Sequence, residues 1–220
     1  MRHLHLIYTL CLCALILPFT STTQCSWSGG LVTGLNVANI RHDNEALSSN
    51  PKLGFLLGIR VACHPSDRLV IQAEALIERK GSQVETTLTD IEGNPISEMT
   101  TAKDHFEYLV FPLTVQWRFG SGNFRYGPYA GAYVAKLIRQ TFVFTLEDES
   151  FRQDRTDFFQ KSDAGMVIGL GAGWALDDML SLNLEARYNH GLTYFQPAVL
   201  SSDRTRHQSL ALMAALQFTF

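Results

Sequence analysis

Four residues in the C-terminal third have the side-chain types of a hydrolytic site: Glu185, His190, His207 and Ser209. A serine hydroxyl beside an imidazole that a carboxylate orients would be an activated nucleophile. The strand pattern set out below, however, places His207 and Ser209 on the inner face and His190 on the outer face, so the set does not converge. We therefore expect no catalytic residue. The sequence also has no cofactor-binding motif and no metal-ligand spacing, so we expect neither a cofactor nor a bound metal.

A second set of charged residues falls on the inner face of the same pattern: Arg60, Glu74, Glu78, Arg118, Arg125, Glu185 and Arg187. Charges in a low-dielectric interior must pair or meet water, because an unpaired buried charge is costly. We interpret the set as a lumen charge network that fills and stiffens a narrow barrel. A selective ion path is the functional alternative.

The elements that would position these residues are strands with a period of two. In the segment 52–63, one face is apolar and the other is small or charged; the apolar face carries Leu53, Phe55, Leu57, Ile59, Val61 and Cys63. The same alternation occurs at 109–119, 180–189 and 209–220, and more loosely at 28–40, 69–79, 124–138 and 164–174. In 164–174 the glycines share the inner face, which leaves room for large neighbouring side chains.

The connections between these eight segments alternate in length. Short polar turns at 64–67, 120–123 and 176–179 separate longer links at 41–50, 80–104, 140–163 and 193–205. Short turns on one rim and long loops on the other are typical of an outer-membrane barrel, whose short side is periplasmic. Lipid offers no partner to an open sheet edge, so the first and last strands must pair. The sequence predicts an all-β, eight-stranded antiparallel transmembrane up-and-down β-barrel.

The link 80–104 itself contains residues that favour strands, namely Val84, Thr86, Leu88 and Thr89. The two flanking strands are therefore expected to extend as a hairpin beyond the membrane. Such a ridge could recruit a partner by edge addition.

The bulk composition excludes two classes of protein. With 46% hydrophobic and 18% charged residues and a mean hydropathy of +0.01, the chain is far too polar for a helical membrane protein. Its formal net charge of -3, without a cluster of Lys and Arg, argues against nucleic acid as a partner.

The N-terminus has the pattern of a cleaved signal peptide: Arg2, His3 and His5 precede an apolar stretch at 6–17, followed by Pro18 and a small polar run. We expect residues 1–24 to be removed and 25–220 to form the barrel. Cys25 and Cys63 would then lie in an oxidising compartment. They could pair, or Cys63 could simply face lipid as an isolated thiol.

Aromatic residues near the ends of the predicted strands are interpreted as a girdle at the membrane interfaces. The set is Trp117, Phe119, Tyr126, Tyr188, Phe218 and Phe220.

Several short motifs resemble a known family, the small outer-membrane β-barrel domain of Bacteroidota, often described as PorT-like. The matching stretches are 34–39 (GLNVAN), 75–81 (ALIERKG), 108–113 (YLVFPL), 126–131 (YGPYAG), 169–173 (GLGAG), 185–188 (EARY) and the C-terminal aromatic residue. The resemblance implies an integral outer-membrane barrel of a Gram-negative cell, and some relatives are linked to protein secretion.

We therefore expect a structural or interaction role in the outer membrane, with an accessory role in secretion as a specialisation. The expected partners are outer-membrane lipids and, through the long loops, secretion-apparatus or envelope proteins. A narrow porin-like channel for small solutes or ions is the alternative.

Overall fold

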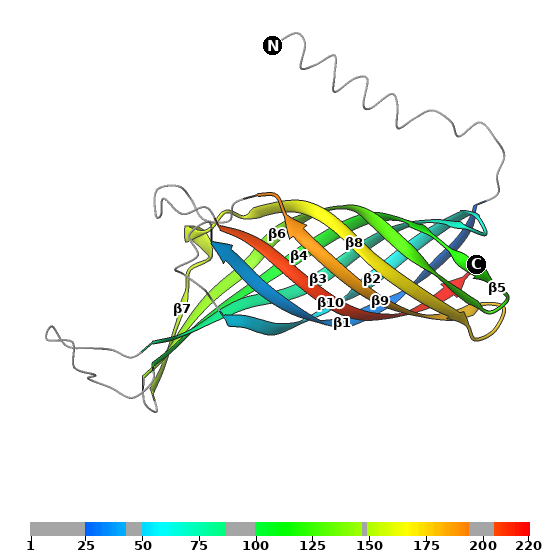
Figure 1. Ribbon diagram of the computed structural model, residues 1–220. Helices are drawn as coiled ribbons and strands as arrows, with labels where there is room; N and C mark the ends of the chain where they lie inside the picture. Colours follow the sequence, from blue (N-terminus) through cyan, green and yellow to red (C-terminus); the bar gives the residue numbers. More distant parts are fainter. Residues whose placement is uncertain (1–24, 43–49, 87–99, 147–148, 194–204) are drawn as a thin grey trace, which may run out of the picture.

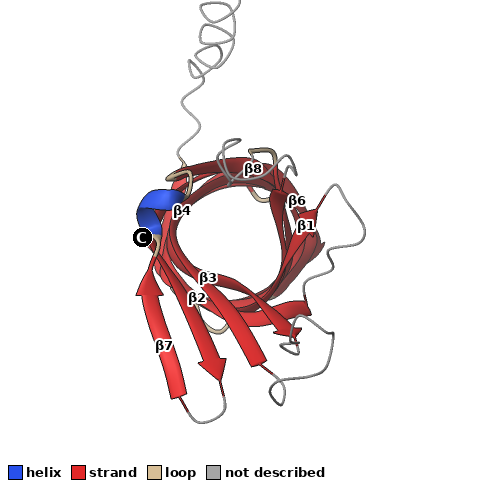
Figure 2. Ribbon diagram, turned by 90° about the vertical axis from the view of Figure 1, so that its left-hand side faces the viewer, coloured by secondary structure: helices blue, strands red, loops and turns tan. Residues whose placement is uncertain are grey.

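The computed structural model of the protein describes residues 25–42, 50–86, 100–146, 149–193 and 205–220. Eight long strands in these ranges close into one antiparallel barrel, seen from the side in Figure 1 and along its axis in Figure 2. They are β1 (Ser26–His42), β2 (Asn50–Ser66), β3 (Leu69–Thr86), β4 (Thr100–Trp117), β6 (Phe124–Leu146), β8 (Ser162–Ala175), β9 (Leu180–Gly191) and β10 (Thr205–Thr219).

The barrel closes through the first and last strands. Around the ring the order is β1-β2-β3-β4-β6-β8-β9-β10, and β10 pairs with β1 from Thr219 opposite Ser28 to Thr205 opposite His42. No edge of the ring is left open among these strands, as a sheet that crosses lipid requires. The predicted eight-stranded closed barrel is confirmed.

Three shorter elements complete the described part of the chain. Strand β5 (Phe119–Ser121) pairs with the start of β6, and β7 (Glu149–Asp154) pairs with its end. A single 3-10 turn, η1 (Thr156–Phe158), follows β7. In the described ranges, no helix has the length and apolar character needed to span a membrane.

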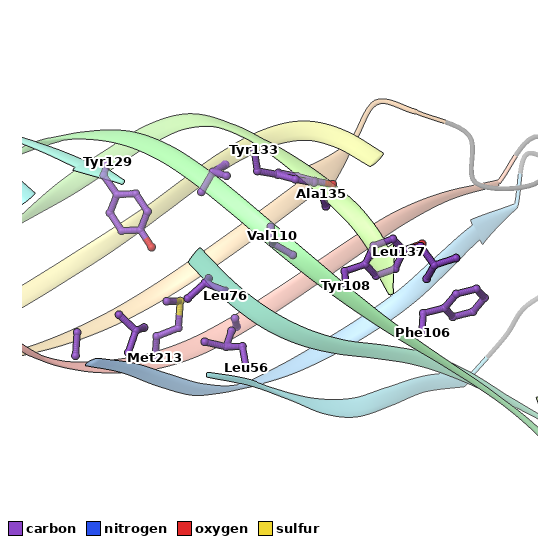
Figure 3. Close-up of a cluster of buried hydrophobic side chains, with 14 residues drawn as sticks. Leu56, Leu76, Phe106, Tyr108, Val110, Tyr129, Tyr133, Ala135, Leu137 and Met213 are labelled. Carbon is purple, nitrogen blue, oxygen red and sulfur yellow. The ribbon is translucent and has the colours of Figure 1, made fainter. Parts of the chain in front are cut away.

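The apolar faces of the strands point outward. Leu53, Leu57 and Ile59 on β2 are 65%, 55% and 56% exposed, whereas Leu56 and Arg60, of opposite parity, are 1% exposed. The protein core is therefore the lumen itself. Figure 3 shows its buried apolar side chains arranged along the barrel axis, from Tyr129 to Phe106.

Glycines of β8 make room for the tyrosines of β6. A Cβ atom at Gly169 would lie 2.4 Å from Cζ of Tyr129, and one at Gly165 would lie 2.5 Å from Cε1 of Tyr133. A side chain at either position would displace the ring that fills the lumen beside it.

Both ends of the described chain lie at the rim with the short turns, on the right in Figure 1. At the opposite rim, strands extend into two of the predicted long links. The sequence predicts the extension into 80–104, whereas the predicted boundaries of the link 140–163 were wrong. β3 runs to Thr86 and β4 begins at Thr100, while the β6–β7 hairpin occupies much of 140–163. Val84 and Thr86 lie in the extended β3, whereas Leu88 and Thr89 lie outside the described residues.

The extension bends away from the barrel at two register shifts. One lies in β6, where Glu107 pairs with Arg139 but Tyr108 pairs with Leu137, which leaves Ile138 as an extra residue. The other lies between Pro51 and Leu56 in the β2–β3 pairing. Such β-bulges kink a strand and re-aim its side chains. Strands β3, β4, β6 and β7 therefore form a sheet that projects past the rim (Figures 1 and 2).

Candidate functional site

An ion-pair network crosses the middle of the lumen. It consists of Arg60 on β2, Glu74 on β3, and Glu185 and Arg187 on β9. In a ring of eight strands in this order, β3 and β9 are opposite one another. The contact between Glu74 and Arg187 therefore joins the two walls directly.

Glu74 is the centre of this network. Its Oε1 accepts hydrogen bonds from Nε of Arg60 at 2.8 Å and Nη2 of Arg187 at 2.9 Å, and its Oε2 accepts one from Nη1 of Arg187 at 2.6 Å. Arg60 also pairs with Glu185. All four residues are 7% exposed or less, so two guanidinium groups and two carboxylates neutralise one another with little exposure to water.

Tyr129 of β6 supports the network from a third side. Its hydroxyl accepts a hydrogen bond from Nε of Arg187 at 3.2 Å, and the guanidinium lies 5.6 Å from the ring centroid. Buried tyrosine hydroxyls usually find a polar partner, and here the partner is a charged one.

A second polar cluster lies nearer the loop end, around Glu78. Its carboxylate accepts a hydrogen bond from Nδ2 of Asn36 at 2.7 Å and lies 3.3 Å from Nζ of Lys80. That ammonium group also lies 5.6 Å and 5.5 Å from the ring centroids of Tyr108 and Tyr133. Side chains therefore also fill the lumen between the first network and the loop end.

The loop end of the lumen is apolar. Phe106 is 1% exposed and meets the ring of Phe159 edge-on, with centroids 5.2 Å apart. Gln140 is fully buried beside it and donates a hydrogen bond from Nε2 to Oδ1 of Asp104 at 2.7 Å. These contacts fix the segment that includes η1 at the rim of the barrel (Figure 2).

The turn end is open and polar. A cavity of about 610 Å³ is lined by side chains that include His64, Arg118 and Arg125, and its inner end reaches Arg60 and Glu185. Arg118 donates from Nη2 to Nδ1 of His64 at 2.9 Å, and Arg125 donates to the main-chain oxygen of Asp67 at 3.1 Å.

His64 lies past the apolar face of β2, at the turn rim. Because Arg118 donates to Nδ1, Nε2 carries the proton and donates to Oγ of Ser28 at 2.9 Å. Burial, and then the charge of Arg118, lower the pKa of the imidazole to about 4.

The seven predicted lumen charges therefore occupy three places. Arg60, Glu74, Glu185 and Arg187 form one network, Glu78 belongs to the second cluster, and Arg118 and Arg125 line the turn-end cavity. The prediction missed Lys80 and also Asp163, a buried carboxylate whose Oδ2 accepts a hydrogen bond from the hydroxyl of Tyr133 at 3.1 Å, because both were assigned to long links. Lys80 has the same parity as Glu74 and Glu78, so continuing the alternation past Arg79 would have found it.

The serine and histidines considered for catalysis are not assembled. Ser209 is buried and receives a hydrogen bond from Nδ2 of Asn189 at 3.2 Å, while its Oγ lies 3.4 Å from Oε1 of Glu78. His190 has outward parity and pairs across the strands with Met166 and Gln208. The side chain of His207 lies outside the described residues.

Five of the six girdle aromatics lie toward the turn end: Trp117, Phe119, Tyr126, Phe218 and Phe220. All five are 48% or more exposed, and Phe119 and Tyr126 contact each other with ring centroids 6.2 Å apart. Tyr188 lies three residues from the loop end of β9.

Cys25 and Cys63 form a disulfide, which ties the residue before β1 to the turn end of β2. Residues 1–24, where a signal peptide is expected, lie outside the described residues. Within the described ranges, no three His, Cys, Asp or Glu side chains are grouped as a metal site would need.

Solved structures similar in shape have low sequence identity to this chain. Neisserial surface protein A (NspA) is 13% identical, with 87% of this chain and 97% of that chain covered and a TM-score of 0.47. OprG from Pseudomonas aeruginosa is 15% identical, with 89% and 95% covered and a TM-score of 0.46. The outer membrane protease OmpT from Escherichia coli is 11% identical, with 93% and 99% covered and a TM-score of 0.46.

No curated protein matches the sequence. The family described as "Outer membrane protein beta-barrel domain", however, matches residues 23–195, which include seven of the eight long strands. The chain therefore belongs to the outer membrane protein beta-barrel domain family.

Proposed function

We propose that the chain is a closed, non-conducting outer-membrane barrel with a structural and interaction role, exported after removal of residues 1–24. The observation that carries this proposal is the ion-pair network between opposite walls of the lumen, centred on Glu74 and Arg187. Eight strands leave an interior just wide enough for side chains, and here the side chains are paired charges and tyrosines. A solute would have to break buried ion pairs to pass.

The interaction surface is the sheet that projects from the loop end. Among the described residues, β7 pairs only with β6. The main-chain N–H of Arg155 donates to the oxygen of Gln140 at 3.1 Å. This bond determines which residues of β7 direct their main-chain N–H and C=O groups towards β6. By alternation, the main-chain groups of Ser150, Arg152 and Asp154 point away from β6. They form an edge to which an extended segment of a partner could add.

An accessory role in protein secretion is the specialisation of this interaction role that we favour. It rests on the resemblance to the PorT-like barrels of Bacteroidota, some of which are linked to secretion. The partner would be a secretion-apparatus or envelope protein that reaches the projecting sheet.

A narrow porin-like channel for small solutes or ions is the second candidate, and the polar cavity of about 610 Å³ at the turn end favours it. Ions can enter this cavity from one side, and they would meet Arg60 and Glu185 at its inner end. Conduction would then require the network to rearrange.

Conductance in a planar lipid bilayer separates these two candidates. We expect the refolded protein to be silent, and Arg60→Ser combined with Glu185→Ser, a charge-balanced removal of one ion pair, to leak. Stable unitary steps from the unaltered protein would exclude the non-conducting barrel. A gel shift between unheated and boiled samples confirms that each variant is folded.

The secretion role is tested on cells. Secreted and surface proteins are compared between cells with the gene, without it, and complemented by it. A defined set of exported proteins should disappear from outside the cell and accumulate in the periplasm when the gene is removed. An unchanged exported set would reject the secretion role and leave a structural role in the envelope.

A further inference from the structure

A small pocket lies on the outer wall of the barrel, at the border between the apolar band and the projecting sheet. It has a volume of about 250 Å³. Its apolar side is formed by Leu35, Leu53 and Phe55, which are 57%, 65% and 44% exposed. Its polar side is formed by the side chains of Lys52, Arg79 and His105. Apolar and cationic groups thus meet in one hollow on the face that contacts lipid.

Lys52 reaches this pocket because of the bulge in the pairing of β2 with β3. Lys52 has the parity of the inward residues Gly54 and Leu56, yet its Nζ donates a hydrogen bond to Nε2 of His105 at 3.0 Å. His105 pairs with Gly81 and has the parity of the outward residues of β4. The register shift between Pro51 and Leu56 therefore brings the ammonium group to the outer face.

Arg79 stands at the other side of the pocket. Its guanidinium lies 5.1 Å from the ring centroid of Phe55, and its Nε donates to Oε1 of Glu107 at 3.1 Å. Its Nη2 pairs with the same carboxylate oxygen, and the arginine side chain remains 43% exposed. This group is held in place with part of its surface open to a further anion.

More positive charge surrounds the pocket on the same face. Lys103 pairs with Val143, which in turn pairs with Arg152, so the two cations lie on the outer side of β4 and β7. We define the basic patch as Lys52, Arg79, Lys103, His105 and Arg152. Among the described residues, the strand pairing places two carboxylates on this face: Glu107, and Asp154, which pairs with Thr141 opposite His105. Asp104 has the opposite parity and binds Gln140.

The titration of His105 reflects this excess of positive charge. Burial lowers the pKa of its imidazole below the usual 6.5, and four cations lower it further: Lys52, Arg79, Arg152 and Lys103. An anion placed among these groups would relieve their mutual repulsion.

We propose that this pocket binds a phosphate group of a phosphorylated glycolipid of the outer leaflet, with Lys52 and Arg79 as its cationic ligands. Three observations support this occupant. The pocket lies at the edge of the apolar band, where a lipid headgroup meets the hydrocarbon region. It is at the rim opposite the short turns, which in this class of barrel is the outer side. Its exposed Leu35, Leu53 and Phe55 are available to the acyl chains, while the patch complements phosphate charge.

Native mass spectrometry of the refolded, full-length barrel in detergent provides the test, with bisphosphorylated lipid A as the probe. We expect lipid A adducts from the unaltered protein. Binding should be at least about tenfold weaker in Lys52→Gln, the scale of one lost charge-assisted hydrogen bond. The double variant Arg79→Gln with Glu107→Gln should lose binding similarly, because it removes the arginine without leaving its carboxylate partner unpaired.

The matched control is Lys136→Gln. Lys136 is an exposed lysine at the same border on β6, next to Val134 but outside the pocket, so its loss should not change binding. Lipid A stripped of both phosphates should bind at least about tenfold more weakly, and inorganic phosphate at the same concentration should not displace the lipid. These two probes separate the phosphate from the acyl chains and the lipid from a free anion.

Equal adduct formation by Lys52→Gln, by the Arg79–Glu107 double variant and by the unaltered protein would overturn the proposal. So would equal binding of the dephosphorylated lipid, or an equal loss in Lys136→Gln. In those cases the basic patch would instead be a surface for an acidic protein segment. The proposal does not depend on conductance or secretion, so its outcome is independent of the proposed function.

Discussion

Replacing Glu74 by Gln should destabilise the folded barrel strongly. The substitution keeps the size of the side chain but removes the charge that Arg60 and Arg187 share. Glu185 would then be the carboxylate left to balance two guanidinium groups, each of which is 1% exposed. Removing one partner of a buried ion pair costs about 3–5 kcal/mol, or roughly two to four orders of magnitude in the folding equilibrium.

The chain contains a matched control for this prediction. Arg79 and Glu107 form the same pair of residue types on the outer wall, where their side chains are 43% and 25% exposed. An exposed pair contributes about 0–1 kcal/mol, so Glu107→Gln should change the free energy of unfolding little. The comparison isolates the effect of burial from the effect of losing an arginine–carboxylate contact.

The assay is urea-dependent unfolding from phospholipid vesicles, followed by tryptophan fluorescence. The three tryptophans, Trp27, Trp117 and Trp174, are all exposed on the outer wall, so their emission reports insertion into lipid. The double variant Glu74→Gln with Arg187→Gln should recover part of the loss, because it leaves Arg60 and Glu185 as a balanced pair. Destabilisation by Glu74→Gln within about 1 kcal/mol of that by Glu107→Gln would refute the reasoning and indicate that water screens the lumen charges.

Three further outcomes are expected. Reduction of the Cys25–Cys63 disulfide, or Cys25→Ser, should lower the free energy of unfolding by up to about 4 kcal/mol, given their separation of 38 residues, and unfolding curves with and without reductant should coincide in the variant. The folded state favours neutral His64, so the stabilisation from His64 is complete above pH 6.5 and is lost as the pH falls towards about 4. The free energy of unfolding should therefore fall by about 1–2 kcal/mol over this range, after allowance for partial exposure, and this fall should be absent from His64→Gln. Ser150→Pro removes an edge N–H that points away from β6, so it should reduce capture of a partner by the projecting sheet while gel mobility shows an intact barrel, and unchanged capture would reject edge addition.

The sequence predicts the inward direction of the central lumen charges, and the structure buries Arg60, Glu74 and Arg187. Side-chain direction alternates along a strand, so the parity of Arg60, Glu74 and Arg187 follows from their own segments alone. The pairing between them could not be predicted in the same way. The pairing depends on the register around the whole ring, which brings β3 opposite β9. No local sequence pattern encodes which residues of these two strands meet across the lumen.

The errors in the prediction have a local cause. Lys80 was assigned to a loop because the apolar alternation of β3 stops near the membrane border, although the strand continues. The alternation predicts that Lys52 faces inward with Gly54 and Leu56, but its ammonium group contacts His105 on the outer face, and the bulge that turns it outward arises from the pairing of β2 with β3. Bulges therefore mark positions at which parity can fail. Of the three register shifts in the described strands, two lie at the start of the projecting sheet and the third, between Cys63 and Ser66, lies at the turn end.

The two charged regions differ in a way that bears on function. In the lumen, the charges of Arg60 and Arg187 are matched by those of Glu74 and Glu185. On the outer wall, the basic patch has an excess of cations over the carboxylates of Glu107 and Asp154, although the chain as a whole carries a net charge of -3. A balanced buried network holds strands together, whereas an unbalanced exposed one attracts counter-charge. The chemistry of this barrel that is open to a ligand is therefore expected on its lipid-facing wall rather than in its lumen.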